Sequence, residues 1–229
     1  MSNIPLITVD GPSGTGKGTV CCYFAIALKW HLLDSGALYR VLAFAANQQG
    51  LALDEEAKLG KLAESLQLKF EMDNDLDGLA VILDDIDVSA QIRTEECGSA
   101  ASMLAALPEV RKSLLHRQRK FRQMPGLIAD GRDMGTVVFP EAELKIFLTA
   151  SAGERALRRY KQLKEKGISV NLRGLSADIA KRDKRDKERL VSPLKPAEDA
   201  IVIDTTEDDI NTVISQISGL VESRFKVVT

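Results

Sequence analysis

The chain has 229 residues, with 45% hydrophobic, 28% charged and 5% aromatic side chains; this is typical of a globular protein and excludes disordered, collagen-like and disulfide-rich classes. Its net charge of −2 argues against a nucleic-acid-binding protein, which would have a basic balance. The sequence contains no membrane-spanning apolar run, no secretory leader, no prenylation box and no cysteine spacing typical of disulfides or metal sites, so we expect a cytoplasmic protein that does not bind membranes.

The first elements form a strand–loop–helix unit. Residues 4–10 are an apolar, β-rich run, a glycine-rich turn follows, and the dense apolar spacing of residues 20–30 predicts a buried helix. A short strand is expected at 31–34, followed by a helix that ends at Gly50.

Residues 51–96 differ from the rest of the chain. They contain thirteen acidic and four basic residues, a local charge of −9. The runs LKFEMD (68–73) and LAVILDD (79–85), joined by the acidic turn NDLDG, predict a β-hairpin. We interpret this segment as an inserted lobe that is not part of the main sheet.

The second half of the chain alternates strands with helices. Helices are predicted at 94–123 (interrupted at Pro108), 153–166, 174–190 and 207–223, and strands at 126–130, 144–150 and 200–205. For the last helix we expect Thr206 as the N-cap and Glu207 to Asp209 in the first turn. Such alternation indicates the α/β class. We expect a three-layer α/β/α sandwich with a five-stranded parallel sheet and insertions.

The glycine-rich turn matches the first part of the P-loop pattern. Its glycines allow backbone N–H groups to converge on phosphate oxygens, and Lys17 is expected to reach the β- and γ-phosphates of ATP. The sequence departs from the generic pattern at Gly18, because the hydroxyl comes one residue later, at Thr19, the candidate ligand of Mg²⁺. The predicted ATP-binding residues are Gly11, Pro12, Ser13, Gly14, Thr15, Gly16, Lys17, Gly18 and Thr19.

Arginines recur on what would be the acceptor side. A kinase that phosphorylates a monophosphate needs no general base, because the attacking oxygen is already anionic; it needs cations that bring two anions together. Arg132 and Asp133 directly follow a predicted strand that ends at Asp130, and ligands bind at the carboxyl ends of such strands. Taken singly, each arginine also fits an ordinary surface position.

Residues 154–189 contain thirteen basic and six acidic residues, a local charge of +7. Within them, Arg155, Arg158 and Arg159 share one face of a predicted helix, and Gly153 and Gly167 flank it. We expect this face to close over the ATP phosphates as a lid. The alternative, a solvated helix face, stays open for the basic segment.

The sequence resembles the bacterial cytidylate kinases, a family of nucleoside monophosphate kinases, over residues 4–205. The blocks that establish the resemblance are GPSGTGKGT (11–19), HLLDSGALYR (31–40), IRTEE (92–96), GLIADGRDMGTVVFP (126–140) and KRDKRDKER (181–189). The resemblance implies a P-loop kinase fold with a core (1–50, 97–150, 171–229), an acceptor-binding lobe (51–96) and a lid (151–170).

The resemblance also implies roles for particular residues. Catalysis would depend on Lys17, Arg132, Arg158 and Arg189, with Asp130 acting through water on Mg²⁺. The implied acceptor-site residues are Arg40, Arg132 and Arg189 at the phosphate, Ser35, Ser102, Arg111 and Asp133 around the cytosine, and Arg182 and Asp186 around the sugar. An ionised Asp133 would favour cytosine, whose N4 amino group is a donor where uracil has an acceptor.

Structural explanations remain open for the three acids. Asp133 also fits a helix N-cap or a partner of Arg132, Asp186 an exposed position in a charge run, and Asp130 a plain strand end. The function that we expect is transfer of the γ-phosphate of ATP to CMP or dCMP, by a monomer, with Mg²⁺. The alternatives are a P-loop kinase for another small acceptor, such as UMP or AMP, and a nucleotide-dependent switch; against the switch, the sequence has no N-K-x-D motif for guanine.

Overall fold

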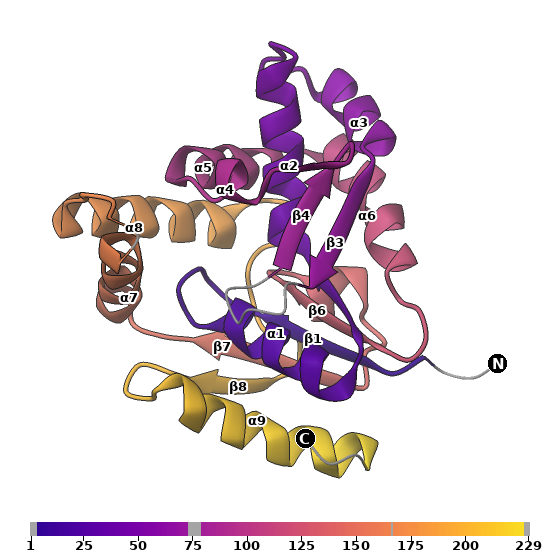
Figure 1. Cartoon of the computed structure of the whole chain (residues 1–229), viewed down its shortest axis with the longest axis vertical. Coiled ribbons are helices and arrows are strands. Elements are labelled where there is room, and N and C mark those ends of the chain that lie inside the picture. The colour runs from indigo at the N-terminus through magenta and orange to yellow at the C-terminus, as the bar shows by residue number, and fades with distance from the viewer. Residues whose placement is uncertain (1–3, 73–78, 166, 227–229) are drawn as a thin grey trace.

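Five parallel strands form the centre of the structure, a computed structural model that describes residues 4–72, 79–165 and 167–226 (Figure 1). Every neighbouring pair in this sheet is parallel. In spatial order the strands are β2 (His31–Asp34), β6 (Leu127–Gly131), β1 (Leu6–Asp10), β7 (Leu144–Thr149) and β8 (Ile201–Asp204). The predicted five-stranded parallel sheet is confirmed.

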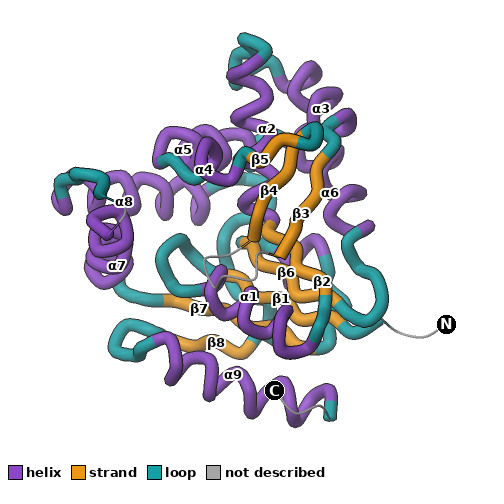
Figure 2. Tube along the Cα trace, viewed as in Figure 1, coloured by secondary structure: helices purple, strands orange, loops and turns teal. Residues whose placement is uncertain are grey.

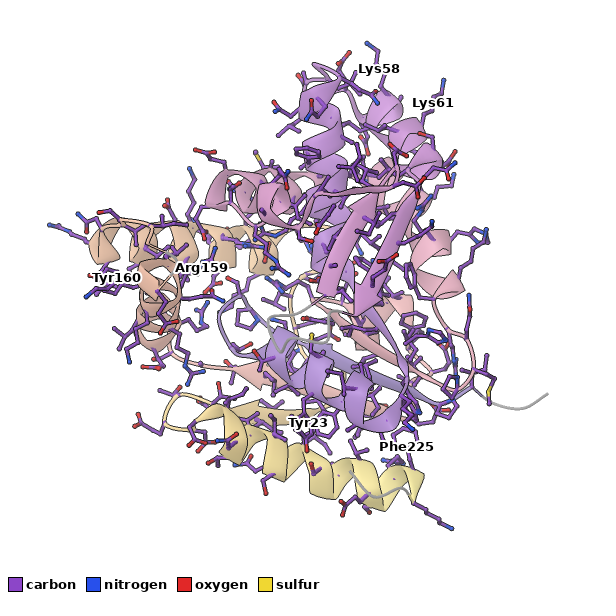
Figure 3. All side chains as sticks on the ribbon, viewed as in Figure 1. Tyr23, Lys58, Lys61, Arg159, Tyr160 and Phe225 are labelled. Atoms are coloured by element: carbon purple, nitrogen blue, oxygen red, sulfur yellow. The ribbon has the colours of Figure 1, made fainter. Side chains whose placement is uncertain are left out.

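Helices cover both faces of this sheet. On one face, α1 (Lys17–Leu28) lies beside α9 (Ile210–Phe225), and Figure 3 shows Tyr23 and Phe225 on these two helices. On the other face are α2 (Ser35–Gln48) and a π-helical turn, η1 (Met134–Val138). Because side chains alternate across a strand, Leu6 faces the α2 layer while its neighbour Ile7 faces α1, and every residue of β1 is buried. The three-layer α/β/α arrangement is therefore confirmed.

The acidic segment forms a separate antiparallel sheet, in which β3 and β4 are the predicted hairpin and β5 is an additional strand (Figure 2). Its strands are β3 (Leu68–Met72), β4 (Leu79–Leu83) and β5 (Ile86–Asp87), and the predicted turn between β3 and β4 lies outside the described residues. This sheet packs on helices that share a second hydrophobic core; they are α2, α3 (Glu56–Ser65), α4 (Ser89–Ile92), α5 (Glu95–Leu104) and α6 (Pro108–Lys120). Figure 3 shows Lys58 and Lys61 on the outer side of α3.

Two further helices, α7 (Ala152–Glu165) and α8 (Leu172–Glu188), pack on each other through a small core of Ala156, Leu163, Leu175 and Ile179. In Figure 1 they lie at the side of the molecule, away from α9. None of the helices in the described part of the chain is long and apolar enough to cross a membrane.

The start of the closing helix was predicted wrongly. Helix α9 begins at Ile210, and its N-cap is Asp209, whose carboxylate accepts a hydrogen bond from the Thr212 amide at 2.8 Å. Thr206 is not an N-cap, because its hydroxyl donates to Asp204 at 2.5 Å and closes a turn after β8. Residues 207–209 therefore precede the helix.

The structure predicts that Gly11→Ala destabilises the protein by about 2 kcal/mol or more, since Gly11 has a φ of 146° and an added Cβ would lie 2.0 Å from the Leu148 carbonyl oxygen of β7. The control is Gly219→Ala in α9, where nothing lies within 4 Å and stability should rise by roughly 0.5–1 kcal/mol. Denaturant unfolding of both variants checks this. An unchanged midpoint for Gly11→Ala would contradict the structure.

Candidate active site

The site begins with acids at the carboxyl ends of three neighbouring strands. Asp10 ends β1 and Asp34 ends β2, and Asp34 lies in register with Asp130 near the end of β6. The Asp10 carboxylate accepts hydrogen bonds from the amides of Met134 and Gly135 at 2.8 and 2.7 Å. The Asp34 carboxylate caps α2 by accepting from the Ala37 amide at 2.9 Å. Backbone bonds thus hold two of these acids in place.

Burial at this edge disfavours the charged forms of its ionisable side chains. It raises the pKa of Asp130 to about 7, an effect that Lys17 and Arg132 oppose and that Asp34 and Asp10 increase. Burial likewise raises the pKa of Asp10 to about 6. Burial and the nearby charge of Arg132 lower the pKa of Lys17 to about 8, against the opposing effect of Asp130. Perturbed groups gathered in this way are typical of functional sites.

The predicted phosphate loop lies between β1 and α1, so the structure brings residues 11–19 together as expected from the sequence order. Gly14 and Gly16 adopt left-handed backbone conformations, with φ of 81° and 89°. The Lys17 ammonium donates to the Pro12 carbonyl at 2.7 Å, and the Thr15 hydroxyl donates to the same oxygen at 3.1 Å. Gly18 and Thr19 are exposed at the start of α1.

A first cluster among the residues predicted for the acceptor side joins Arg132, Asp186 and Ser102. Nε of Arg132 donates to Asp186 at 3.1 Å, and the Ser102 hydroxyl donates to the other oxygen of the same carboxylate at 2.8 Å. Burial favours the neutral form of Asp186, but Arg132 and Arg182 outweigh it and hold its pKa below the usual value. Asp186 is only 4% exposed, so the interpretation of it as an exposed member of a charge run is wrong.

A second cluster surrounds Asp133, which is buried. Its two carboxylate oxygens face two arginines: Arg111 forms an ion pair with Oδ2, and Nη2 of Arg189 lies 3.8 Å from Oδ1. Asp133 occupies the N-cap position of η1 but its side chain makes no capping hydrogen bond, and Arg132 pairs with Asp186 instead. Neither structural alternative for Asp133 therefore describes its contacts.

The arginines leave donors unused. In the part of the chain that the structure describes, Nε of Arg182 and Nη2 of Arg189 are buried guanidinium nitrogens without a hydrogen-bond partner. Burial, together with the charges of Arg132 and Arg40, lowers the pKa of Arg182 to about 10. Arg40 donates to the carbonyls of Ile92 and Thr94 at 2.6 and 2.9 Å. Crowded buried cations with free donors are suited to binding an anion such as a phosphate.

The three arginines of α7 reach three different partners. Arg155 is buried, pairs with Asp183 of α8 and donates to the Ser13 carbonyl of the phosphate loop at 3.2 Å. Arg158 donates to the Thr205 hydroxyl at 3.1 Å. Arg159, labelled in Figure 3, pairs with Glu95 of α5 at 2.7 Å. In this structure α7 is thus tied to the phosphate loop, to the end of β8 and to the acceptor side.

Ser35 lies at the start of α2, where its hydroxyl accepts a hydrogen bond from Gln118 of α6 at 2.8 Å. Sequence reasoning missed Gln118 and Tyr39, whose hydroxyl accepts from Arg111 at 3.4 Å, because only the packing of α6 on α2 reveals them. It also missed Asp10 and Asp34, which had a usable signal. Each directly ends a predicted strand, as Asp130 does.

Comparison with known proteins adds an independent finding. A family model described as cytidylate kinase matches residues 7–223. A cytidylate kinase from Aeromonas hydrophila is 58% identical over 220 residues, which cover 96% of this chain and 95% of that protein. One from Nitrosococcus oceani is 58% identical over 216 residues, 93% of this chain and 94% of that protein. Among solved structures, a gluconokinase from Sinorhizobium meliloti is a loose likeness, with 14% identity, a TM-score of 0.47 and coverage of 97% and 95%.

The raised pKa of Asp130 predicts how stability depends on pH. The native state binds this proton more tightly than the unfolded chain does, so the stabilisation is present at low pH and is lost as the pH rises through about 7. We therefore expect Asp130→Asn to stabilise the protein by about 2 kcal/mol more at pH 8 than at pH 5. Urea unfolding at both pH values measures this difference.

The control for this experiment is Asp178→Asn, at an exposed position of α8, which should show no such pH-dependent gain. An Asp130→Asn variant whose stability change is the same at both pH values would contradict the burial of a strained carboxyl group at this edge.

Proposed function

This chain belongs to the cytidylate kinase family, and we propose that it transfers the γ-phosphate of ATP to CMP or dCMP, giving ADP and CDP or dCDP. ATP would bind on the loop of residues 11–19, with Lys17 at its β- and γ-phosphates. The reaction would serve pyrimidine nucleotide metabolism.

The position of Arg132 is the observation that supports this proposal most strongly. Burial lowers the pKa of Lys17 on the ATP side and the charge of Arg132 lowers it further, while Nε of Arg132 donates to Asp186 on the acceptor side. A single cation therefore lies between the two places where anions would bind. Phosphoryl transfer between two anions requires cations at that point, because their mutual repulsion must be neutralised while the attacking oxygen comes into line.

The acceptor phosphate would be bound by Arg40, Arg132 and Arg189, and Nη2 of Arg189, which makes no hydrogen bond within the described residues, provides a donor for it. Arg182 and Asp186 would bind the sugar. Because the acceptor phosphate is already ionised, no side chain has to remove a proton. Catalysis would then consist of positioning and charge neutralisation by Lys17, Arg132, Arg158 and Arg189.

The base would be recognised around Asp133. Arg111 and Arg189 flank its carboxylate, and an ionised carboxylate accepts a hydrogen bond from an amino group but repels a carbonyl oxygen. Ser35, Ser102 and Arg111 would complete the cytosine site. Ser35 is oriented toward that role by Gln118, and Ser102 by Asp186.

The residues present fit Mg²⁺ bound mainly through the nucleotide. No group of three or more His, Cys, Asp or Glu side chains suited to a metal occurs among the described residues, and Mg²⁺ in such enzymes needs only one or two protein ligands besides phosphates. The exposed Thr19 would hold the ion directly, and the carboxylate of Asp130 would hold it through water. Asp130 is close to the start of α1, since its Oδ2 would lie 3.8 Å from a Cβ at Gly18. Bound there, Mg²⁺ would neutralise charge on the transferred phosphoryl group.

We also propose that residues 51–96 act as the acceptor-binding lobe and residues 151–170 as a lid, in a cytoplasmic monomer. The contacts of α7 support a lid that responds to both substrates, since Arg155 touches the phosphate loop and Arg159 pairs with α5.

The first test is ADP release from ATP and Mg²⁺ in the presence of CMP, dCMP, UMP, AMP or GMP, beside a reaction without acceptor. We expect strong turnover with CMP and dCMP and little with the others. Turnover with UMP or AMP but not CMP would replace the proposed acceptor. ADP release that ignores every acceptor would leave a nucleotide-dependent switch as the better explanation.

A second test concerns the choice of base. Asp133→Asn keeps the shape of the side chain but removes its charge and adds a donor, so the ratio of kcat/KM for CMP over UMP should fall by about 10- to 100-fold. Asp178→Asn, which removes an exposed charge elsewhere on the chain, should leave that ratio unchanged. A ratio that survives in Asp133→Asn would show that another group reads the base.

A further inference from the structure

Ser192 has an unusual backbone conformation beside the proposed acceptor site. It lies after the end of α8 and has a φ of 51°, in the left-handed region that serine rarely adopts. Leu190, two residues earlier, is 100% exposed, so its side chain makes no packing contact that would impose this conformation. Two residues later, the Leu194 amide donates to the Asp186 carbonyl at 2.8 Å and fixes the other end of the loop.

Two arginines account for the conformation. The Ser192 hydroxyl accepts a hydrogen bond from Nη2 of Arg111 at 2.8 Å, and the Ser192 carbonyl accepts one from Nε of Arg189. A single residue therefore uses its side chain for one arginine and its backbone for the other. Left-handed conformations of this kind cost roughly 1–3 kcal/mol and persist where the surrounding contacts require them.

The same two arginines flank Asp133. Nη2 of Arg111, the atom that Ser192 binds, is also the atom that pairs with Oδ2 of Asp133, and Arg189 approaches Oδ1. Each arginine therefore links Ser192 to one oxygen of the Asp133 carboxylate. Nη1 of Arg111 is held separately, by the Ala105 carbonyl at 3.2 Å and the Tyr39 hydroxyl at 3.4 Å. On Nη2 the Ser192 hydroxyl is the one partner besides Asp133, so losing it would weaken the orientation of the nitrogen that pairs with the carboxylate.

We propose that Ser192 is a positioning residue that sets the selectivity of the enzyme for the acceptor base, by orienting Arg111 and Arg189 on opposite oxygens of Asp133. This inference rests on the proposed function, in which Asp133 reads cytosine. It adds a residue that touches neither nucleotide base nor phosphate in that scheme and acts only through the two arginines. The hydroxyl of Ser192 binds Arg111 and its carbonyl binds Arg189, so a substitution can remove the first contact and keep the second.

Two substitutions at this position separate selectivity from stability. Ser192→Gly removes the hydroxyl but adopts the left-handed conformation freely, so the carbonyl can stay on Arg189. Ser192→Thr keeps the hydroxyl but places a β-branched residue at positive φ, which is strained. A purely structural role predicts that the Thr variant loses more of the preference for CMP over UMP, because it is the more strained one. Our proposal predicts that the Gly variant loses more of that preference.

We expect Ser192→Gly to lower the kcat/KM ratio for CMP over UMP by about 10-fold and to raise KM for CMP about 5-fold, with kcat within about twofold of the parent. Ser192→Thr should keep the ratio within about threefold while its melting temperature falls by several degrees. Ser113→Ala on α6, which removes a hydroxyl bonded to Glu64 at 3.1 Å, is the matched control and should change neither quantity.

The parent enzyme, assayed alongside, separates failure of the inference about Ser192 from failure of the proposed function. If the parent prefers CMP and Ser192→Gly keeps that preference, or if Ser192→Thr loses it to the same extent as Ser192→Gly, the role of the hydroxyl is overturned and the proposed function stands. If the parent shows no preference for CMP over UMP, the proposed function fails, and the inference about Ser192 fails with it.

Discussion

Carboxylates drawn out of water at the carboxyl edge of the parallel sheet are the constraint on which the remainder of the structure depends. Asp10 and Asp34 end their strands there and Asp130 lies one residue before the end of β6; Asp10 is buried, and the other two are half-buried. Lys17 and Arg132 are the cations that favour the ionised form of Asp130. Taking such groups out of water is costly, and the cost is offset only where opposite charges and backbone donors are close. The amides of Met134 and Gly135 in η1 donate to Asp10, and the Ala37 amide in the first turn of α2 donates to Asp34. The first turns of these helices therefore lie where the acids need hydrogen-bond donors.

On the proposed acceptor side, arginines are the groups that require nearby opposite charges, and carboxylates supply them. Two buried carboxylates, Asp133 and Asp186, hold arginines that arrive from α6, from the loop after β6 and from α8. The carboxylates do not use all the donors, since Nε of Arg182 and Nη2 of Arg189 have no hydrogen-bond partner among the residues that the structure describes. An internal acid therefore orients each cluster while leaving capacity for an external anion. A site built this way is preorganised, and less reorganisation is required when a charged ligand binds.

Particular elements show how far sequence reasoning reached. The strand–loop–helix order predicted the phosphate loop, and the antiparallel pairing of β3 with β4 agrees with the predicted hairpin, because both signals are local. The prediction of Thr206 as an N-cap was wrong, because the Thr206 hydroxyl donates to Asp204 and Asp209 caps the helix instead. The pairing of Arg132 with Asp186, across 54 residues, had no local signal at all.

Taken alone, the sequence determined the five strands of the main sheet, the β3–β4 hairpin and most of the helices, though not α3 or α4. It also determined where the phosphate loop lies and which family the chain resembles, because apolar periodicity, glycine placement and motif order are local properties of the chain. Only the tertiary structure decided which arginine meets which acid, that Asp133 is flanked by Arg111 and Arg189, and that Ser192 joins those two. The physical reason is that the energy of a charge depends on its burial and its neighbours, and both are set by packing between elements that are distant in the sequence.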